Sequence, residues 1–269
     1  MKARVISALV AVAIIISLYM LLNITGLYVV CFIVVSVCAV EYLQMTLAKV
    51  TAPTFVHVTF LLSLITIYLA AVFIPEYNIS VFGTVSIIFM TILLFTAKRT
   101  IKLSRITLKQ GLGIMGFLYC GIFPALATRL LKMDNGDLWL FTLMGVVFAG
   151  DTFAYLVGKG IGKNKLYEKL SPKKTIEGSI GGLLGSCAFG ATACYVFFEG
   201  QHLGIMIVIS ILTGAFAQIG DLYESLLKRV ANVKDSGKVM PGHGGILDRV
   251  DVVYFGAPVF YTLVLVFQI

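Results

Sequence analysis

The sequence predicts an all-α polytopic membrane protein with about nine transmembrane helices. Of its 269 residues, 59% are hydrophobic and 13% are charged, and the mean hydropathy is +0.99. That is more apolar surface than a water-soluble core can bury. A span needs roughly 20 mostly apolar residues, and backbone hydrogen bonding makes spans in lipid helical. Nine runs fit this length: 5–22, 27–47, 55–74, 79–97, 112–130, 138–158, 180–198, 203–223 and 250–267.

The first run begins after Lys2 and Arg4 and is followed by a second apolar run, without a small-x-small cleavage site. We therefore expect it to be retained rather than removed as a signal peptide. The distribution of Lys and Arg then predicts the orientation. With a cytoplasmic N-terminus, 19 of the 21 basic residues fall in inner segments, and only Arg129 and Lys132 fall in outer ones. This alternation predicts a C-terminus outside.

The net charge of +8 therefore reflects membrane topology and a basic inner face suited to anionic headgroups or phosphates. The basic residues lack the interleaved aromatic residues that nucleic-acid binding uses, so we expect no nucleic-acid partner. The five cysteines all lie within apolar runs and form no C-x-x-C pair. This argues against a metal or redox site built from them.

The distribution of polar residues divides the chain into two regions. Residues 1–110 hold about four spans with short loops, which we interpret as a transmembrane scaffold. Glu41, deep in the second run, could be functional, could hydrogen-bond a neighbouring helix or could lie near the inner interface, so it receives no role. Residues 111–269 hold about five glycine-rich spans and two long cytoplasmic loops, 159–179 and 224–249. We expect the catalytic region there.

The densest polar cluster connects the eighth and ninth runs. If the eighth run continues as a helix, four polar residues share one of its faces at i, i+3, i+4 and i+7: Asp221, Glu224, Ser225 and Lys228. Asp248 and Asp251 share a face where the ninth run begins. Convergence of Asp221 and Asp248 would offer hard oxygen ligands to a divalent cation, with Asp251 or Glu224 adjoining.

A glycine turn, Pro241-Gly-His243-Gly244-Gly245, precedes Asp248. Glycines permit positive φ angles and leave backbone N–H groups accessible to a phosphate. The turn leads into a helix N-terminus, which favours anions. A merely solvated loop would need neither these glycines nor carboxylates at the ends of two spans, so phosphate binding is the favoured interpretation.

Two further motifs lie on the predicted cytoplasmic side. Ser171-Pro-Lys173-Lys174-Thr-Ile-Glu-Gly-Ser enters the seventh run, and its lysines and hydroxyls suit phosphate oxygens. Two lysines before a span are also ordinary positive-inside anchoring, so this motif alone is weak. Asp151 lies in an apolar run, where its carboxylate must be paired, hydrated or bound to a cation.

With these motifs the sequence resembles a known family, the phosphatidate cytidylyltransferases, also called CDP-diacylglycerol synthases. The Gly-Asp151-Thr-x-Ala-Tyr and Ser171 motifs are similar to two of that family's motifs and occur in the right order. The family's long signature is matched without a gap by Ser225-x2-Lys228-Arg229-x4-Lys234-Asp235-x-Gly237-x3-Pro241-x-His243-Gly244-Gly245-x2-Asp248-Arg249-x-Asp251.

The resemblance implies condensation of CTP with phosphatidic acid to give CDP-diacylglycerol and pyrophosphate in phospholipid synthesis, with Mg²⁺ required. A second metal or a monovalent cation stays open. It also implies a homodimer in a bacterial cytoplasmic (inner) membrane, with the active site facing the cytoplasm and open to the lipid bilayer. We expect four catalytic residues: Asp221, Lys228, Asp248 and Arg249. Of these, Asp221 and Asp248 are expected to bind the metal, with Asp251 or Glu224 adjoining. We expect substrate binding at Asp151, Ser171, Lys173, Lys174, Ser225, His243, Gly244 and Gly245.

Two alternatives use similar residues. A CTP-dependent kinase, or a nucleotidyltransferase acting on another membrane lipid, would need the same kinds of carboxylates and lysines. A secondary transporter would also have about nine helices and glycine-broken spans. The two halves show no inverted repeat, however, and the polar residues gather in the inner loops and not at the membrane midplane.

Overall fold

The computed structural model describes residues 2–47, 54–96, 103–240, 242 and 244–269. The chain forms two compact units. Unit one comprises Met1–Thr128 and Ala231–Arg249, and unit two comprises Arg129–Val230 and Val250–Ile269. This structural division differs from the predicted functional division into 1–110 and 111–269, which remains a prediction.

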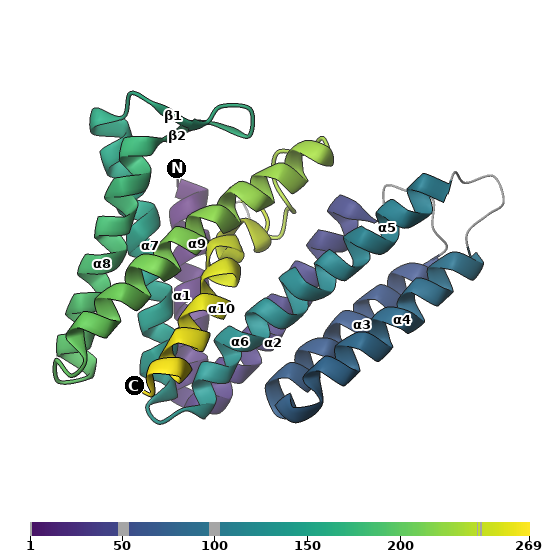
Figure 1. Ribbon diagram of the computed structural model, residues 1–269, viewed down its shortest axis with the longest axis horizontal. Helices are drawn as coiled ribbons and strands as arrows, with labels where there is room; N and C mark the ends of the chain where they lie inside the picture. Colours follow the sequence, from purple (N-terminus) through teal and green to yellow (C-terminus); the bar gives the residue numbers. More distant parts are fainter. Residues whose placement is uncertain (1, 48–53, 97–102, 241, 243) are drawn as a thin grey trace. The chain divides into compact units, whose positions relative to one another are not determined.

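Unit one is built from helices that follow one another in the sequence and alternate in direction (Figure 1). Pro75 begins a short 3-10 turn, as its fixed φ and missing N–H allow at a helix start. A π-helical segment interrupts the fifth long helix. The elements are α1 (Lys2–Leu22), α2 (Ile24–Thr46), α3 (Thr54–Phe73), η1 (Pro75–Tyr77), α4 (Asn78–Thr96), α5 (Leu103–Gly116), η2 (Phe117–Ile122) and α6 (Phe123–Arg129).

An aromatic cluster forms the centre of unit one. The ring of Phe60 lies 6.1 Å from that of Tyr42 and 5.3 Å from that of Phe117, which in turn lies 5.2 Å from Phe89. A side chain at Gly116 would come within 2.6 Å of Tyr42 and 2.8 Å of Phe60. Glycine at this position therefore lets α5 approach the cluster closely.

Unit two contains the longest helices and the only two strands among the described residues. A β-hairpin separates α7 from α8, and α8 packs against both α7 and α9 (Figure 1). The elements are η3 (Leu130–Lys132), α7 (Gly136–Ile161), β1 (Lys165–Tyr167), β2 (Ser171–Thr175), α8 (Ile176–Phe197), α9 (Leu203–Val230) and α10 (Leu247–Phe267), whose first residues belong to unit one.

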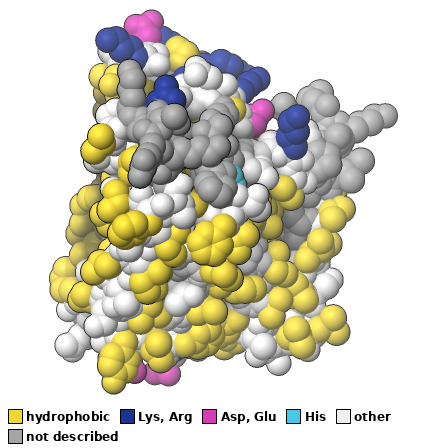
Figure 2. Space-filling model, turned by 90° about the vertical axis from the view of Figure 1, so that its right-hand side faces the viewer, with side chains coloured by type: hydrophobic (Ala, Val, Ile, Leu, Met, Phe, Trp, Pro, Cys, Tyr) yellow, Lys and Arg dark blue, Asp and Glu magenta, His cyan; other side chains and the backbone are white. Residues whose placement is uncertain are grey.

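The predicted all-α membrane fold is confirmed. Eight helices within the described residues are long and apolar enough to cross a membrane, and each overlaps one predicted run. The remaining run, 5–22, falls within α1. Figure 2 shows hydrophobic side chains over most of the described surface of one face. The chain is therefore an integral membrane protein, while its orientation remains a prediction.

The two long loops predicted in the second half of the sequence are shorter than expected. Helix α7 continues to Ile161 and α9 to Val230, both past their apolar runs. Lys228 and Arg229 in the last turn of α9 interact favourably with its C-terminal dipole. The connecting segments are therefore 162–175 and 231–246 instead of 159–179 and 224–249.

Candidate active site

The β-hairpin between α7 and α8 carries the Ser171 motif. Its strands are antiparallel, with Lys165 opposite Thr175 and Tyr167 opposite Ser171. Thr175 also caps α8, because its hydroxyl accepts a hydrogen bond of 3.1 Å from the N–H of Gly178. One residue thus ends the second strand and begins the helix, which fixes where the preceding lysines lie.

Glu177 connects the two ends of this hairpin. Its carboxylate accepts hydrogen bonds from the backbone N–H groups of Lys163 and Asn164, both at 3.1 Å, and from the Asn164 side-chain amide at 2.7 Å. These donors lie just after α7, whereas Glu177 lies in the first turn of α8. The bonds therefore hold the hairpin against the ends of both helices.

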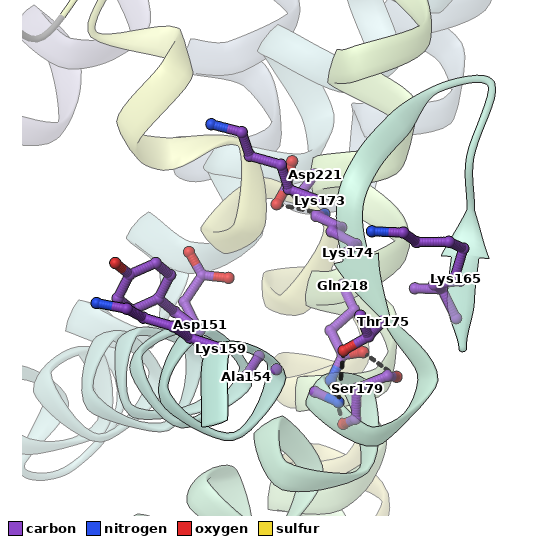
Figure 3. Close-up of a pocket in the computed structure, with 14 residues that line it drawn as sticks. Asp151, Ala154, Lys159, Lys165, Lys173, Lys174, Thr175, Ser179, Gln218 and Asp221 are labelled. Carbon is purple, nitrogen blue, oxygen red and sulfur yellow. Dashed lines mark hydrogen bonds and ion pairs between the residues drawn. The ribbon is translucent and has the colours of Figure 1, made fainter. Parts of the chain in front are cut away.

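A cavity of about 600 Å³ opens beside this hairpin, entirely within unit two (Figure 3). Four lysines and two aspartates line it, a formal excess of two positive charges. The charged side chains come from α7, both strands and α9, so three parts of the chain contribute to one surface. Its polar lining is Asp151, Tyr155, Lys159, Lys165, Lys173, Lys174, Thr175, Ser179, Gln218 and Asp221.

Two contacts organise the wall of the cavity (Figure 3). Lys174 and Asp221 form an ion pair in which both side chains remain about one-quarter exposed. Gln218 accepts a hydrogen bond from the Ser179 hydroxyl and donates one of 3.1 Å to the Ser179 carbonyl. Because Gln218 lies one helical turn before Asp221, these contacts join α9 to both the hairpin and α8.

The remaining cavity lysines are available to an anionic ligand. In the part of the chain that the structure describes, Lys165 and Lys173 form no ion pair with a carboxylate. Several ammonium groups that converge on one space attract a polyanion and can each donate to phosphate oxygens. The cavity is also of the size usual for small-molecule sites. Its chemistry therefore suits a phosphorylated ligand.

The other predicted residues of α9 lie beyond the cavity lining. The Ser225 hydroxyl donates a hydrogen bond of 3.5 Å to Asp221 Oδ1, and Lys228 forms an ion pair with Glu224. Glu224 is only 1% exposed and Asp251 only 5%. Asp251 is repelled by Glu224 and Asp221 and attracted by Lys228. The predicted shared face of α9 therefore exists, and the Asp251 carboxyl group of α10 lies near it.

The glycine turn and Asp248 belong to unit one. One oxygen of Asp248, Oδ2, accepts hydrogen bonds from Ser236 N at 2.8 Å, Ser236 Oγ at 3.0 Å and Gly245 N at 2.9 Å. Gly244 has a φ of +87°, which favours glycine, and its carbonyl accepts a bond from Met240 N. The turn is therefore closed by backbone contacts, while the predicted residue His243 lies outside the described residues.

The structure thus brings together some predicted residues in one cavity, and others belong to a different unit. The cavity of unit two contains Asp151, Lys173, Lys174 and Asp221, but Ser171 does not line it. Unit one contains Asp248, Arg249, Gly244 and Gly245. The predicted joint binding of a metal by Asp221 and Asp248 concerns residues of different units and remains a prediction.

Sequence reasoning missed several residues of the cavity. Lys159 and Lys165 are among the 19 basic residues that indicate membrane orientation, and no motif points to them or to Gln218 as binding residues. Gln218 did carry a signal, because it is a polar residue inside an apolar run at i−3 from Asp221, hence on the same helix face. The hairpin that presents Lys165 had no comparable signal in the sequence.

The carboxylates fit a hard divalent cation such as Mg²⁺. Within the described residues, no group of three or more His, Cys, Asp or Glu side chains surrounds one point. Mg²⁺ at phosphate sites, however, is usually held by one or two carboxylates together with phosphate oxygens and water. Asp221 lies at the cavity with part of its carboxylate exposed, and the buried carboxyl groups of Glu224 and Asp251 lie near it.

Fold and cavity together define an integral membrane protein with a basic, carboxylate-edged cavity whose chemistry suits a phosphorylated ligand. Comparison with known proteins gives the family. The sequence model of the cytidylyltransferase family matches residues 2–267, so this chain belongs to that family. The resemblance that the motifs indicated is therefore confirmed.

Several curated bacterial proteins named phosphatidate cytidylyltransferase are similar to the chain. The protein of Bacillus subtilis is 34% identical over 182 residues, which cover 67% of this chain and 68% of the relative. That of Synechocystis is 33% identical over 252 residues, 83% of each chain. That of Staphylococcus haemolyticus is 40% identical over 157 residues, and this match spans about half of the relative, 55% of its length.

Proposed function

We propose that this protein is a phosphatidate cytidylyltransferase, a nucleotidyltransferase that condenses CTP with phosphatidic acid to CDP-diacylglycerol and pyrophosphate. The family match and the names of the relatives support this activity. The observation in the structure that carries it is the cavity, in which four lysines and two aspartates surround a space of about 600 Å³. Both proposed substrates are polyanions, and both carry the phosphate oxygens that such a cavity binds.

The reaction is a displacement at phosphorus. An oxygen of the phosphatidate phosphate forms a bond to the α-phosphorus of CTP, and the bond from that phosphorus to the oxygen bridging to the β-phosphate breaks. Pyrophosphate leaves with the electron pair of the broken bond. Because both reactants are anionic, the protein must chiefly neutralise charge and align the groups.

The cavity residues supply these functions. Lys173, Lys174 and Lys165 bind phosphate oxygens and lower the repulsion between the two substrates. Lys174 is paired with Asp221, so a phosphate that takes over Lys174 leaves this carboxylate able to bind a cation. Gln218, held by Ser179, keeps α9 in position for this exchange.

Magnesium is the cofactor we propose. Asp221 would hold it, with Glu224, Asp251 and Asp248 as further candidate ligands, and it would supply positive charge to the phosphates of CTP. A second metal or a monovalent cation fits the same donor chemistry. We further propose that the site faces the cytoplasm of a bacterial inner membrane, that phosphatidic acid reaches it from the bilayer, and that the protein acts as a homodimer.

The first test is turnover by the purified, detergent-solubilised protein. Labelled CTP, phosphatidic acid and Mg²⁺ should give labelled CDP-diacylglycerol in the organic phase, and EDTA should stop its formation. Diacylglycerol offered with CTP labelled in its γ-phosphate, and polyprenyl phosphate offered with CTP labelled in its α-phosphate, should give no labelled lipid. Formation of a labelled product only from one of these acceptors would overturn the proposed substrate, and turnover in EDTA would overturn the metal.

A further inference from the structure

Glu41 is a carboxylate in an unusual place. It lies in the interior of α2, a span of unit one, and only 2% of its surface is exposed. A charged group there is costly unless polar partners compensate it. In the described chain, the recorded ion pairs are Lys174–Asp221 and Lys228–Glu224, so no lysine or arginine neutralises Glu41.

The partners of Glu41 all come from one segment about 200 residues further along the chain. Its Oε1 accepts a hydrogen bond from Ile246 N at 3.0 Å, and its Oε2 accepts from Leu247 N at 2.8 Å and from Ser236 Oγ at 3.1 Å. Both carboxylate oxygens are therefore occupied by the 236–247 segment. Ile246 and Leu247 lie at the start of α10, where backbone N–H groups lack helical partners.

The same segment binds the carboxylate of Asp248. Ser236 contributes both its N–H and its hydroxyl to Asp248, and the hydroxyl also lies within hydrogen-bonding distance of Glu41. Because a hydroxyl has one proton, it can donate fully to only one of the two carboxylates at a time. Glu41 and Asp248 therefore both bind the segment, and Ser236 contacts both carboxylates.

Two glycines let Glu41 come this close. A Cβ atom at Gly237 would lie 2.6 Å from the Glu41 carboxyl carbon, and one at Gly245 would overlap both Ser236 Oγ and Glu41 Oε2. The glycines at these two positions thus leave room for the carboxylate as well as for the turn. The residue types at positions 236, 237 and 245, one serine and two glycines, therefore suit the contact with Glu41.

We propose that Glu41 is a positioning residue, which fixes the 236–247 segment and thereby the orientation of Asp248. This inference rests on the proposed function, because Asp248 is a proposed magnesium ligand of the cytidylyltransferase reaction. Residues that orient a metal ligand typically change metal affinity when they are substituted. Glu41 itself contacts neither substrate nor metal in this proposal.

The experiment compares Glu41→Gln with Tyr42→Phe in the purified full chain. The glutamine amide nitrogen cannot accept a hydrogen bond, so the variant loses at least one bond to the segment. Tyr42→Phe removes the hydrogen bond of 2.8 Å that the neighbouring hydroxyl on the same helix donates to Leu112 O, and it leaves the bonds between Glu41 and the segment in place. Ser236→Ala provides a second variant that removes no charge and leaves the bonds of Ile246 and Leu247 to Glu41 in place.

Two measurements decide the outcome. Hydrogen–deuterium exchange should be faster in peptides covering 236–247 of Glu41→Gln, and not in Tyr42→Phe. The Mg²⁺ concentration for half-maximal turnover should rise about tenfold in Glu41→Gln, less in Ser236→Ala and not in Tyr42→Phe, while turnover at saturating Mg²⁺ falls less. Unchanged exchange, or faster exchange with wild-type Mg²⁺ dependence, would overturn the proposal. Absence of CDP-diacylglycerol formation by the wild type would instead refute the proposed function, and exchange would still report whether Glu41 holds the segment.

Discussion

Two carboxylates of unit one and two of unit two are compensated in different ways. In unit one, Glu41 and Asp248 are held by backbone N–H groups and one serine hydroxyl. In unit two, Asp221 and Glu224 are paired with lysines. A backbone N–H cannot leave without moving the chain, whereas a lysine can turn away to a new anion because its side chain is long and flexible.

A carboxylate bound by backbone N–H groups is therefore fixed, whereas a carboxylate paired with a lysine can exchange its partner. The carboxylates of unit one bind a segment of the chain. In the proposed function, Asp221, which lines the cavity, releases Lys174 when a phosphate binds there. Substitution of Asp221 or of the cavity lysines should therefore change catalysis more than stability. The following predictions test that contrast, beginning with the largest effect.

Asp221→Asn should reduce the formation of CDP-diacylglycerol by a factor on the order of 100 or more, because an amide neither binds a divalent cation well nor pairs with Lys174. The thermal unfolding temperature in detergent should stay close to that of the wild type. Asp137→Asn is the matched control. Asp137 lies in the first turn of α7, where its carboxylate accepts a hydrogen bond from Leu138 N, and it does not line the cavity. Equal activities of the two variants would remove Asp221 from the site.

Lys173→Gln should lower kcat/KM for CTP about tenfold, since one of four cavity ammonium groups no longer binds phosphate. The loss should appear mainly in KM and should shrink as ionic strength rises, because salt already screens the wild-type attraction. Lys169→Gln removes the same charge from the hairpin turn between β1 and β2, outside the cavity lining. A comparable loss in Lys169→Gln would mean that the hairpin acts through its general charge and not through this cavity.

The sequence predicted the parts of this site that depend on local spacing. Lipid as solvent makes apolar runs helical, and the i, i+4 spacing placed Glu224 beside Lys228, as the ion pair confirms. The partners of Glu41 could not be predicted in this way, because they lie about 200 residues away and include backbone N–H groups that any residue provides. The hairpin that carries Lys165 was missed for a related reason, since its strands are short and it is held by Glu177 and Thr175.

Glu177 sharpens the comparison, because it is a carboxylate of unit two that is held by backbone N–H groups, as those of unit one are. It should therefore act on structure and not exchange partners. Glu177→Gln keeps one acceptor oxygen for Lys163 and Asn164, so we expect only about a threefold loss of kcat/KM, together with faster proteolysis within residues 162–175. Glu168→Gln, in the turn of the same hairpin, should change neither quantity. If Glu177→Gln lost as much activity as Asp221→Asn without loosening the hairpin, Glu177 would have to be placed with the exchangeable carboxylates, and the type of hydrogen-bond partner would no longer distinguish the two kinds.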